Sequence, residues 1–282
     1  QLEVADKTKG SLVGTELRTP SLTIHVGGTL EIVGAASLFV DVLNVSGTLK
    51  ATGGMNTVGR YKVGGETRGH ERAGSAHGGV GGIRYSEPDS ACTSTYGSIT
   101  FPTEVGSYGG HERYCSPWGG GAVRVVSSRV VEIGPQGVLS ADGNGCALHN
   151  SYGAGSGGSV LVIAPRILSY GRISADGGFL SDGNFGNGGG GRVALHAEVL
   201  ELGPAAEVTA AEGKSSRVPG NNHNGQPGSA GTVWMQGNPI TNVLRFPLST
   251  QWTGWTMTKT EAALAQVSIE EGAQVEYAVN AY

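Results

Sequence analysis

Two aspartates occupy the same position in repeated Ser-Ala-Asp-Gly phrases, and their carboxylates are the first candidates for chemistry in this chain. Asp142 lies in SADGNG and Asp176 in SADGG. If the two phrases lie on neighbouring strands, the carboxylates come within about 5 Å of each other. Such a pair could bind Ca²⁺ or act as an acid/base couple in polysaccharide cleavage. The alternative is structural, because Asp before Gly favours turns by bonding to its own backbone.

The row of carboxylates predicted in this way is short. A third copy of the phrase has Ala211 at the aspartate position, and an earlier related phrase has Thr52 there. We therefore assign no firm metal site and keep Ca²⁺ as the one candidate cofactor.

The tetrapeptide Gly-His-Glu-Arg occurs twice, at 69–72 and 110–113. With His77 and His149, these copies supply imidazoles and carboxylates, which are ligand types of zinc sites. Neither copy has the His-Glu-x-x-His spacing that aims two ligands at one metal from a helix. Ion pairs between Glu and Arg side chains are the alternative interpretation.

Cys92, Cys115 and Cys146 are the only cysteines, and none belongs to a Cys-x-x-Cys motif. Cys92 and Cys115 bracket one irregular segment, so we predict a disulfide between them. Closing a loop of that length would stabilise the fold by about 3 kcal/mol in the chain-entropy treatment. The alternative is two buried thiols in an intracellular protein. Cys146 is left over as a free thiol or an intermolecular link.

Trp252 and Trp255, in QWTGWTM, are candidates for contact with sugar rings. In a strand the two side chains would face opposite sides, because three residues separate them. One of them is then expected to lie in the core.

Asn44 begins Asn-Val-Ser, the only glycosylation sequon with a permitted middle residue. In a protein secreted from a eukaryotic cell, Asn44 could carry a glycan.

Three similar phrases, at 119–145, 155–178 and 188–213, define the organisation of the chain. Each runs from a glycine cluster through a short apolar strand and a second strand to Ala-Asp-Gly or a relative of it. One such unit cannot bury its own apolar face, so repetition predicts a stack of units.

The repeats predict an all-β fold, a right-handed parallel β-helix (solenoid) with long Gly-rich loops on one face. Apolar runs of strand length separated by tight Gly corners can coil in this way, and Gly permits the backbone conformations of the corners. Insertions at one position of each unit would gather on one face. A two-sheet sandwich is the competing fold, but it does not explain three like phrases in one register.

A series of glycine-rich motifs resembles the glycine-rich β-helical module of large secreted or cell-surface proteins. The motifs occur in the order HGGVGG (77–82), YGS (96–98), GGGAVRV (119–125), GSGGSVLV (155–162), GGGGRVAL (188–195) and AGTVWM (230–235). The resemblance covers roughly 73–236. It implies extracellular scaffolding or adhesion and supplies no catalytic residue.

Charge and hydropathy exclude several classes of protein. The net charge is −4, with a pI of about 6.0, and no basic stripe exists that would neutralise phosphates, so nucleic acid is not an expected partner. No apolar run reaches the roughly 18 residues of a membrane span. Because the chain begins at Gln1, we expect a processed mature protein or a fragment of a longer one.

The predicted domains are the β-helix over 1–249, with a loop excursion at 55–118, and a capping or subunit-linking tail over 250–282. Head-to-tail contacts between subunits produce filaments when the subunits do not close into a ring. We therefore expect an extracellular, non-enzymatic structural protein, the subunit of a self-assembling fibre or surface appendage, with itself as partner. One alternative is a monomeric cell-surface adhesin or glycan-binding module. The other is a polysaccharide lyase or hydrolase.

Overall fold

The regular elements of the protein are β-strands throughout the part of the chain that its structure, a computed structural model, describes. This part comprises residues 1–12, 15–59, 73–82, 94–109, 117–145, 153–180, 186–213 and 228–238, and the backbone of the strands at 243–246, 255–258, 266–269 and 274–277. Within these residues, no helix is long and apolar enough to cross a membrane.

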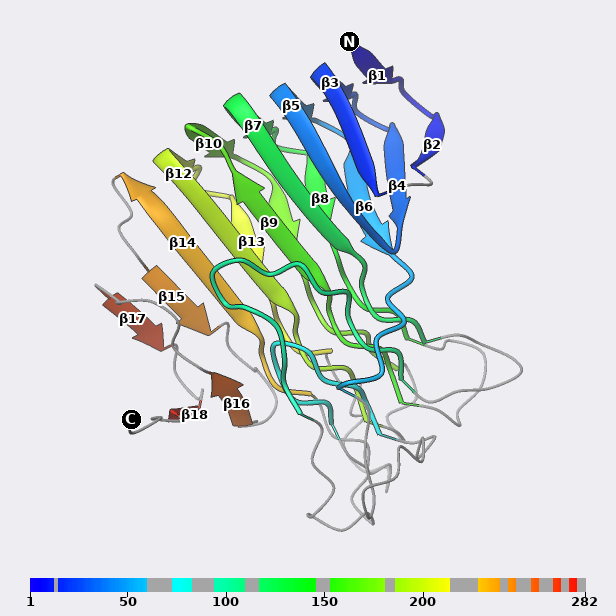
Figure 1. Ribbon diagram of the computed structural model, residues 1–282, viewed down its shortest axis with the longest axis vertical. Coiled ribbons are helices and arrows are strands. Elements are labelled where there is room, and N and C mark those ends of the chain that lie inside the picture. The colour runs from blue at the N-terminus through cyan, green and yellow to red at the C-terminus, as the bar shows by residue number, and fades with distance from the viewer. Residues whose placement is uncertain are drawn as a thin grey trace.

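Two mainly parallel sheets face each other (Figure 1). Sheet A has ten strands in the order β1-β3-β5-β7-β10-β12-β14-β15-β17, with β9 also lying between β7 and β12. Its strands are β1 (Leu2–Val4), β3 (Glu16–Ile24), β5 (Ala35–Val45), β7 (Ala122–Ile133), β9 (Ser159–Ile163), β10 (Arg166–Ser169), β12 (Arg192–Leu202), β14 (Thr232–Asn238), β15 (Val243–Phe246) and β17 (Gln266–Ile269).

Sheet B has six parallel strands in the order β13-β11-β8-β6-β4-β2. They are β2 (Lys9–Leu12), β4 (Thr29–Val33), β6 (Thr48–Thr52), β8 (Val138–Ser140), β11 (Arg172–Ser174) and β13 (Glu207–Thr209). A separate parallel pair joins β16 (Trp255–Thr258) to β18 (Gln274–Tyr277).

The core lies between the two sheets because alternate residues of their strands are apolar. In β4, Leu30 and Ile32 are buried, while Glu31 points to the outer face. The paired strands repeat this pattern, so apolar side chains from both sheets form one continuous cluster. The outer face of sheet B is mainly polar, although Val33 of β4 is exposed on it.

The predicted right-handed parallel β-helix with glycine-rich loops on one face is wrong. Pro165 has no backbone N–H and separates β9 from β10. Both short strands pair with β7 on one side and with β12 on the other, one after the other along the two long strands, so one strand position of sheet A is divided in two. The sheets have unequal numbers of strands, and β15 joins β14 antiparallel. The repeat in the sequence does not continue as one uniform coil.

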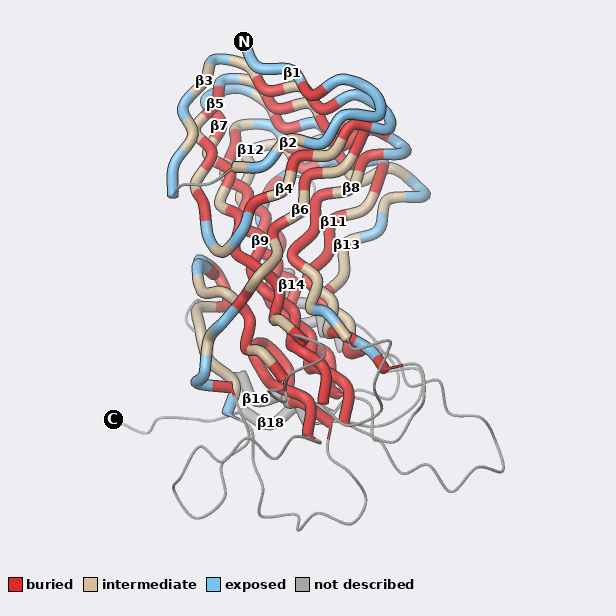
Figure 2. Tube along the Cα trace, turned by 90° about the vertical axis from the view of Figure 1, so that its right-hand side faces the viewer, coloured by how far each residue is buried: buried red, intermediate tan, exposed pale blue. Residues whose placement is uncertain are grey.

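The glycine-rich segments 73–82, 117–121, 153–158, 186–191 and 228–231 are buried, and together we call them the glycine body (Figure 2). Their backbones bond to one another: the amide of Gly120 donates to Ser156 O at 2.9 Å, and that of Gly157 donates to Gly189 O at 2.9 Å. An added Cβ at most of these glycines would meet backbone atoms under 3.0 Å away. These segments are therefore a packed part of the fold and not loops on its surface.

Residues 94–109, which we call the strap, cross the outer face of sheet A. Ile99 packs against Leu161 of β9, Ala194 of β12 and Trp234 of β14. Phe101 stacks on His196 with 4.6 Å between ring centroids, and a nitrogen of the same imidazole lies 2.6 Å from Thr100 O. The strap leaves the outer face of sheet B uncovered.

Candidate functional site: a groove on the outer face of sheet B

The outer face of sheet B carries rows of polar side chains that run across its strands. Ser11, Glu31, Lys50, Ser140, Ser174 and Thr209 follow one another through the pairings of β2, β4, β6, β8, β11 and β13. Parallel pairing in constant register produces such rows, because side chains of paired residues point to the same face.

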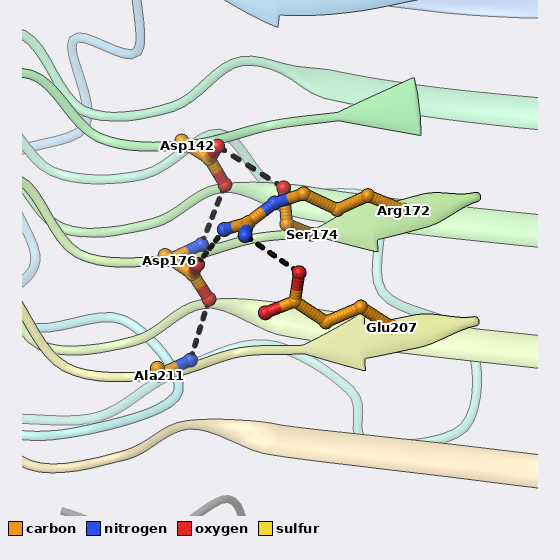
Figure 3. A network of polar contacts seen from close by, with 6 residues as sticks. All are labelled: Asp142, Arg172, Ser174, Asp176, Glu207 and Ala211. Atoms are coloured by element: carbon orange, nitrogen blue, oxygen red, sulfur yellow. Dashed lines mark hydrogen bonds and ion pairs between the residues drawn. The ribbon is translucent and has the colours of Figure 1, made fainter. Parts of the chain in front are cut away.

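Asp142 and Asp176 lie side by side just beyond the ends of β8 and β11, two residues after the paired Ser140 and Ser174 (Figure 3). The Asp142 carboxylate accepts hydrogen bonds from the backbone N of Asp176 at 2.8 Å and from Ser174 Oγ at 3.0 Å. Asp176 Oδ1 accepts one from the backbone N of Ala211 at 2.7 Å. Each carboxylate thus satisfies a backbone donor of the next segment, where the regular strand pairing has ended.

Arg172 joins the aspartates to β13. Its guanidinium pairs with the carboxylate of Asp176 and, at 2.8 Å, with that of Glu207. Burial raises the pKa of Asp176, and the nearby Asp142 raises it further, against the opposing effects of the Ala211 amide and Arg172. Burial lowers the pKa of Arg172, but Asp176 and Glu207 outweigh it and raise that pKa above its usual value.

Glu31 forms a second charged cluster at the other end of the face. Its carboxylate lies 2.6 Å from Lys9 Nζ and 3.3 Å from Lys50 Nζ, and it accepts a hydrogen bond from Thr52 Oγ1 at 3.1 Å. The bond from Lys9, followed by those from Lys50 and Thr52, lowers the pKa of Glu31 to about 2 despite the opposing effect of burial. The carboxylate therefore stays ionised, and both lysines are paired with it.

Two adjoining hollows make this face concave. The larger, of about 560 Å³, lies over β11 and β13, and the other, of about 470 Å³, lies over β4, β6 and the end of β8. Asp142 and Gly143 line both hollows, so the two adjoin, and together we call them the sheet B groove.

An aromatic side chain lines each hollow of the groove. Phe179, which follows the Asp176 turn, is 59% exposed and lines the larger hollow. Trp118 is half-buried and lines the other. The groove thus combines flat apolar surfaces with charged and hydroxyl groups in fixed positions.

Few side chains on the outer face of sheet B are placed to bind a metal ion. Across the described ranges, no group of three or more His, Cys, Asp or Glu side chains is placed to hold a metal ion. Asp142 and Asp176 offer two carboxylates that already accept bonds from backbone, serine or arginine donors. The Ca²⁺ site at these residues stays a prediction.

Other residues singled out in the sequence lie elsewhere. Asn44 is half-buried on β5, between Thr23 of β3 and Glu132 of β7. Trp255 is the first residue of β16. Several positions fall outside the described residues: Cys92, Cys115, Cys146, His149, Trp252 and both Gly-His-Glu-Arg segments.

His77, considered as a zinc ligand from the sequence, is fully buried where the glycine body meets the strap. Its Nδ1 donates to Gly157 O at 2.9 Å, and its ring lies 4.5 Å from that of Tyr96. Burial, with a smaller effect of Arg192, lowers the pKa of His77 to about 3. Burial also raises the pKa of Tyr96, whose hydroxyl donates to Val105 O at 2.8 Å. This cluster links buried segments and is separate from the groove.

Sequence reasoning missed Trp118 and Phe179 as members of one site. Trp118 directly precedes the Gly-Gly-Gly of the first repeat, and Phe179 directly follows the Ala-Asp-Gly-Gly of the second. Aromatic residues beside the repeated glycine motifs were the available signal.

No protein-family model, curated protein or solved structure matches this chain. The resemblance to the glycine-rich module stays an expectation from the order of its motifs.

Proposed function

We propose that this protein is an extracellular glycan-binding module, and that the sheet B groove is its binding site. The observation that carries the proposal is the pair of adjoining hollows over the outer face of sheet B, one lined by Trp118 and the other by Phe179.

The chemistry of the groove suits sugars. A sugar ring has apolar C–H faces and a rim of hydroxyl groups, so it packs on aromatic rings and hydrogen-bonds to charged and hydroxyl side chains. Phe179 offers the first kind of surface, and Asp142 and Glu207 offer hydrogen-bond acceptors beside it. Burying an aromatic face against a ligand supplies affinity, while the polar groups fix its orientation.

The polar groups are also held in place before a ligand binds. Asp142 is fixed by two hydrogen bonds, and Arg172 by pairs with two carboxylates. Preorganised groups lose little conformational entropy on binding, which favours affinity. A site on packed strands, beside a glycine body with buried backbone, is rigid enough for this role.

The fibre-subunit function stays a prediction and ranks second. At the described edges of the sheets, β1 and β2 carry Glu3 and Lys9, and charged residues on edge strands discourage pairing with another chain. The sheet B groove, by contrast, is built from one chain and needs no assembly to function.

The test is binding of the full chain to a panel of neutral and acidic polysaccharides, by affinity electrophoresis and calorimetry. Phe179→Ala is the informative variant, because this side chain is 59% exposed and its removal leaves the fold intact. Phe101→Ala is the matched control, since Phe101 is 55% exposed but lies on the strap over sheet A.

We expect at least one polysaccharide to bind, and Phe179→Ala to weaken it roughly tenfold or more. Phe101→Ala should bind like the wild type. Failure of every polysaccharide to bind, or equal losses in the two variants, would overturn the proposal.

A further inference from the structure

We infer that the sheet B groove takes a linear, uncharged polysaccharide that lies across the strands and stacks on Trp118 and Phe179 at once. The inference rests on the proposed function and specifies the class of glycan. It follows from the position of the two aromatic side chains relative to the strands. It also follows from the ion pairs that the charged side chains of the groove form with one another.

The two aromatic residues are separated by two strand spacings. Trp118 lies beside the end of β6, since a Cβ on Gly53 would come 3.6 Å from its indole ring. Phe179 lies beyond the end of β11, in the segment that follows Asp176. The order β6-β8-β11 puts one strand between them, which corresponds to roughly 10 Å.

This distance matches two sugar units of an extended chain. In a ribbon-like polysaccharide, each sugar ring is flipped relative to the ring before it. Every second ring therefore presents the same face to a surface that the chain lies on. Two rings related in this way would rest on Trp118 and Phe179. The ring between them would lie over the end of β8, where Asp142 lines both hollows and can accept hydrogen bonds from hydroxyl groups. A strongly coiled chain would not keep its rings along this line.

The charges of the groove favour a neutral chain. Lys50 is paired with Glu31, and Arg172 with Asp176 and Glu207, so these cations are already engaged by carboxylates. Asp142 adds a further carboxylate at the centre. A chain of uronic acids would bring a carboxylate on each sugar against these acidic groups, and like charges at close range repel.

Calorimetry with cello-oligosaccharides, from the disaccharide to the hexasaccharide, tests the inference because these chains are linear, neutral and ribbon-like. Mannuronate oligosaccharides serve as the charged comparison, since they have the same kind of linkage. The variants are Phe179→Ala, Trp118→Ala and Trp118→Phe. The last keeps an aromatic ring and guards against loss of binding through misfolding.

We expect affinity to rise about tenfold or more between the disaccharide and the tetrasaccharide, because only the longer chain reaches both rings. Phe179→Ala and Trp118→Ala should each abolish this rise, and Trp118→Phe should retain most of it. Mannuronates should bind more weakly than cello-oligosaccharides of equal length.

The outcomes separate the two proposals. Binding of another glycan class with no gain from chain length, or a preference for mannuronates, would overturn this inference and leave the groove as a glycan site. Absence of binding to any glycan would overturn both.

Discussion

The substitution Gly157→Ala should destabilise the protein severely, although it adds a single methyl group. Gly157 lies in the glycine body, and its amide donates to Gly189 O at 2.9 Å. A Cβ at this position would lie 2.0 Å from Ala175 O and 2.5 Å from the backbone N of Gly191. Both are main-chain atoms, so no side chain can rotate away to relieve the contact.

The expected cost follows from the bonds that must be broken. Ala175 O accepts the hydrogen bond of Gly191 N at 2.7 Å, so the methyl group would enter between bonded partners. Overpacking costs about 1–3 kcal/mol, and a lost backbone hydrogen bond costs about 1 kcal/mol, or more when its groups stay buried. We expect a loss of about 3–5 kcal/mol, a large fraction of the 5–15 kcal/mol typical of folded domains.

Urea denaturation of the wild type and the variant measures this loss directly. Gly10→Ala is the matched control, because a Cβ on Gly10 meets only the Leu30 Cδ1 atom, at 3.3 Å. Gly10 lies in β2, and its replacement should change the free energy of unfolding by less than about 1 kcal/mol. If Gly157→Ala unfolds within 0.5 kcal/mol of the wild type, roughly the scatter of surface substitutions, the close backbone packing is refuted.

Three further predictions concern the buried histidine, the charged cluster and the strap. Because the pKa of His77 is lowered to about 3, an unfolded chain binds a proton below about pH 6.5 that the folded chain does not. The free energy of unfolding should therefore fall as pH drops from 6.5 towards 3, with His77 contributing at most about 1.4 kcal/mol per pH unit. Urea titrations at several pH values should show a shallower fall in His77→Gln, and identical slopes would contradict this. The pKa of Glu31 is lowered to about 2, so its contribution is complete above its ordinary pKa of 4.5 and is lost as pH falls towards 2. Thermal unfolding of Glu31→Gln should show a loss below about 1 kcal/mol at neutral pH that disappears near pH 2, and a loss independent of pH would argue against the cluster. Ile99 is only 3% exposed and packs the strap against sheet A. Ile99→Ala should therefore lower the free energy of unfolding by about 2–4 kcal/mol and speed proteolysis within 94–109. Stability and proteolysis like those of the wild type would contradict this packing.

The strands were the predictable part of this fold. Alternating apolar residues at 21–34 and 37–54, broken by Val-Gly-Gly-Thr and Val-Ser-Gly-Thr, correspond to β3 with β4 and to β5 with β6. The breaks coincide with turns, and Gly27 has a φ of 77°, which side chains disfavour. Burial of one face imposes a period of two on the sequence, so this level of structure is visible in it.

The glycine body was not predictable in the same way. A run of glycines has no side-chain pattern, and its usual interpretation is a turn or a loop. Here Gly79 donates to Gly190 O at 2.8 Å, a bond between distant segments that depends on the absence of side chains on both. Pro165 could be recognised in the sequence as a residue that interrupts a strand. That β9 and β10 on either side of it both pair with β7 could not be predicted, because this depends on the length of β7.

The candidate site was predictable in part. The repeated Ser-Ala-Asp-Gly phrases indicated that Asp142 and Asp176 are neighbours, and the structure places them on adjacent segments. The structural alternative considered for them was a bond to their own backbone, whereas the carboxylates accept from the backbone of the next segment. Phe179 could not be assigned to the groove from the sequence, because its orientation depends on which side of the segment after β11 meets solvent.

NMR titration of the isotopically labelled chain with a cello-oligosaccharide tests the central claim most directly, because it locates the binding face. We expect the amide resonances of 142–145 and 176–179 to shift progressively with ligand, while those of the strap at 94–109 stay unchanged. Shifts confined to the strap or to the outer face of sheet A, or none at saturating ligand, would contradict a glycan site on sheet B.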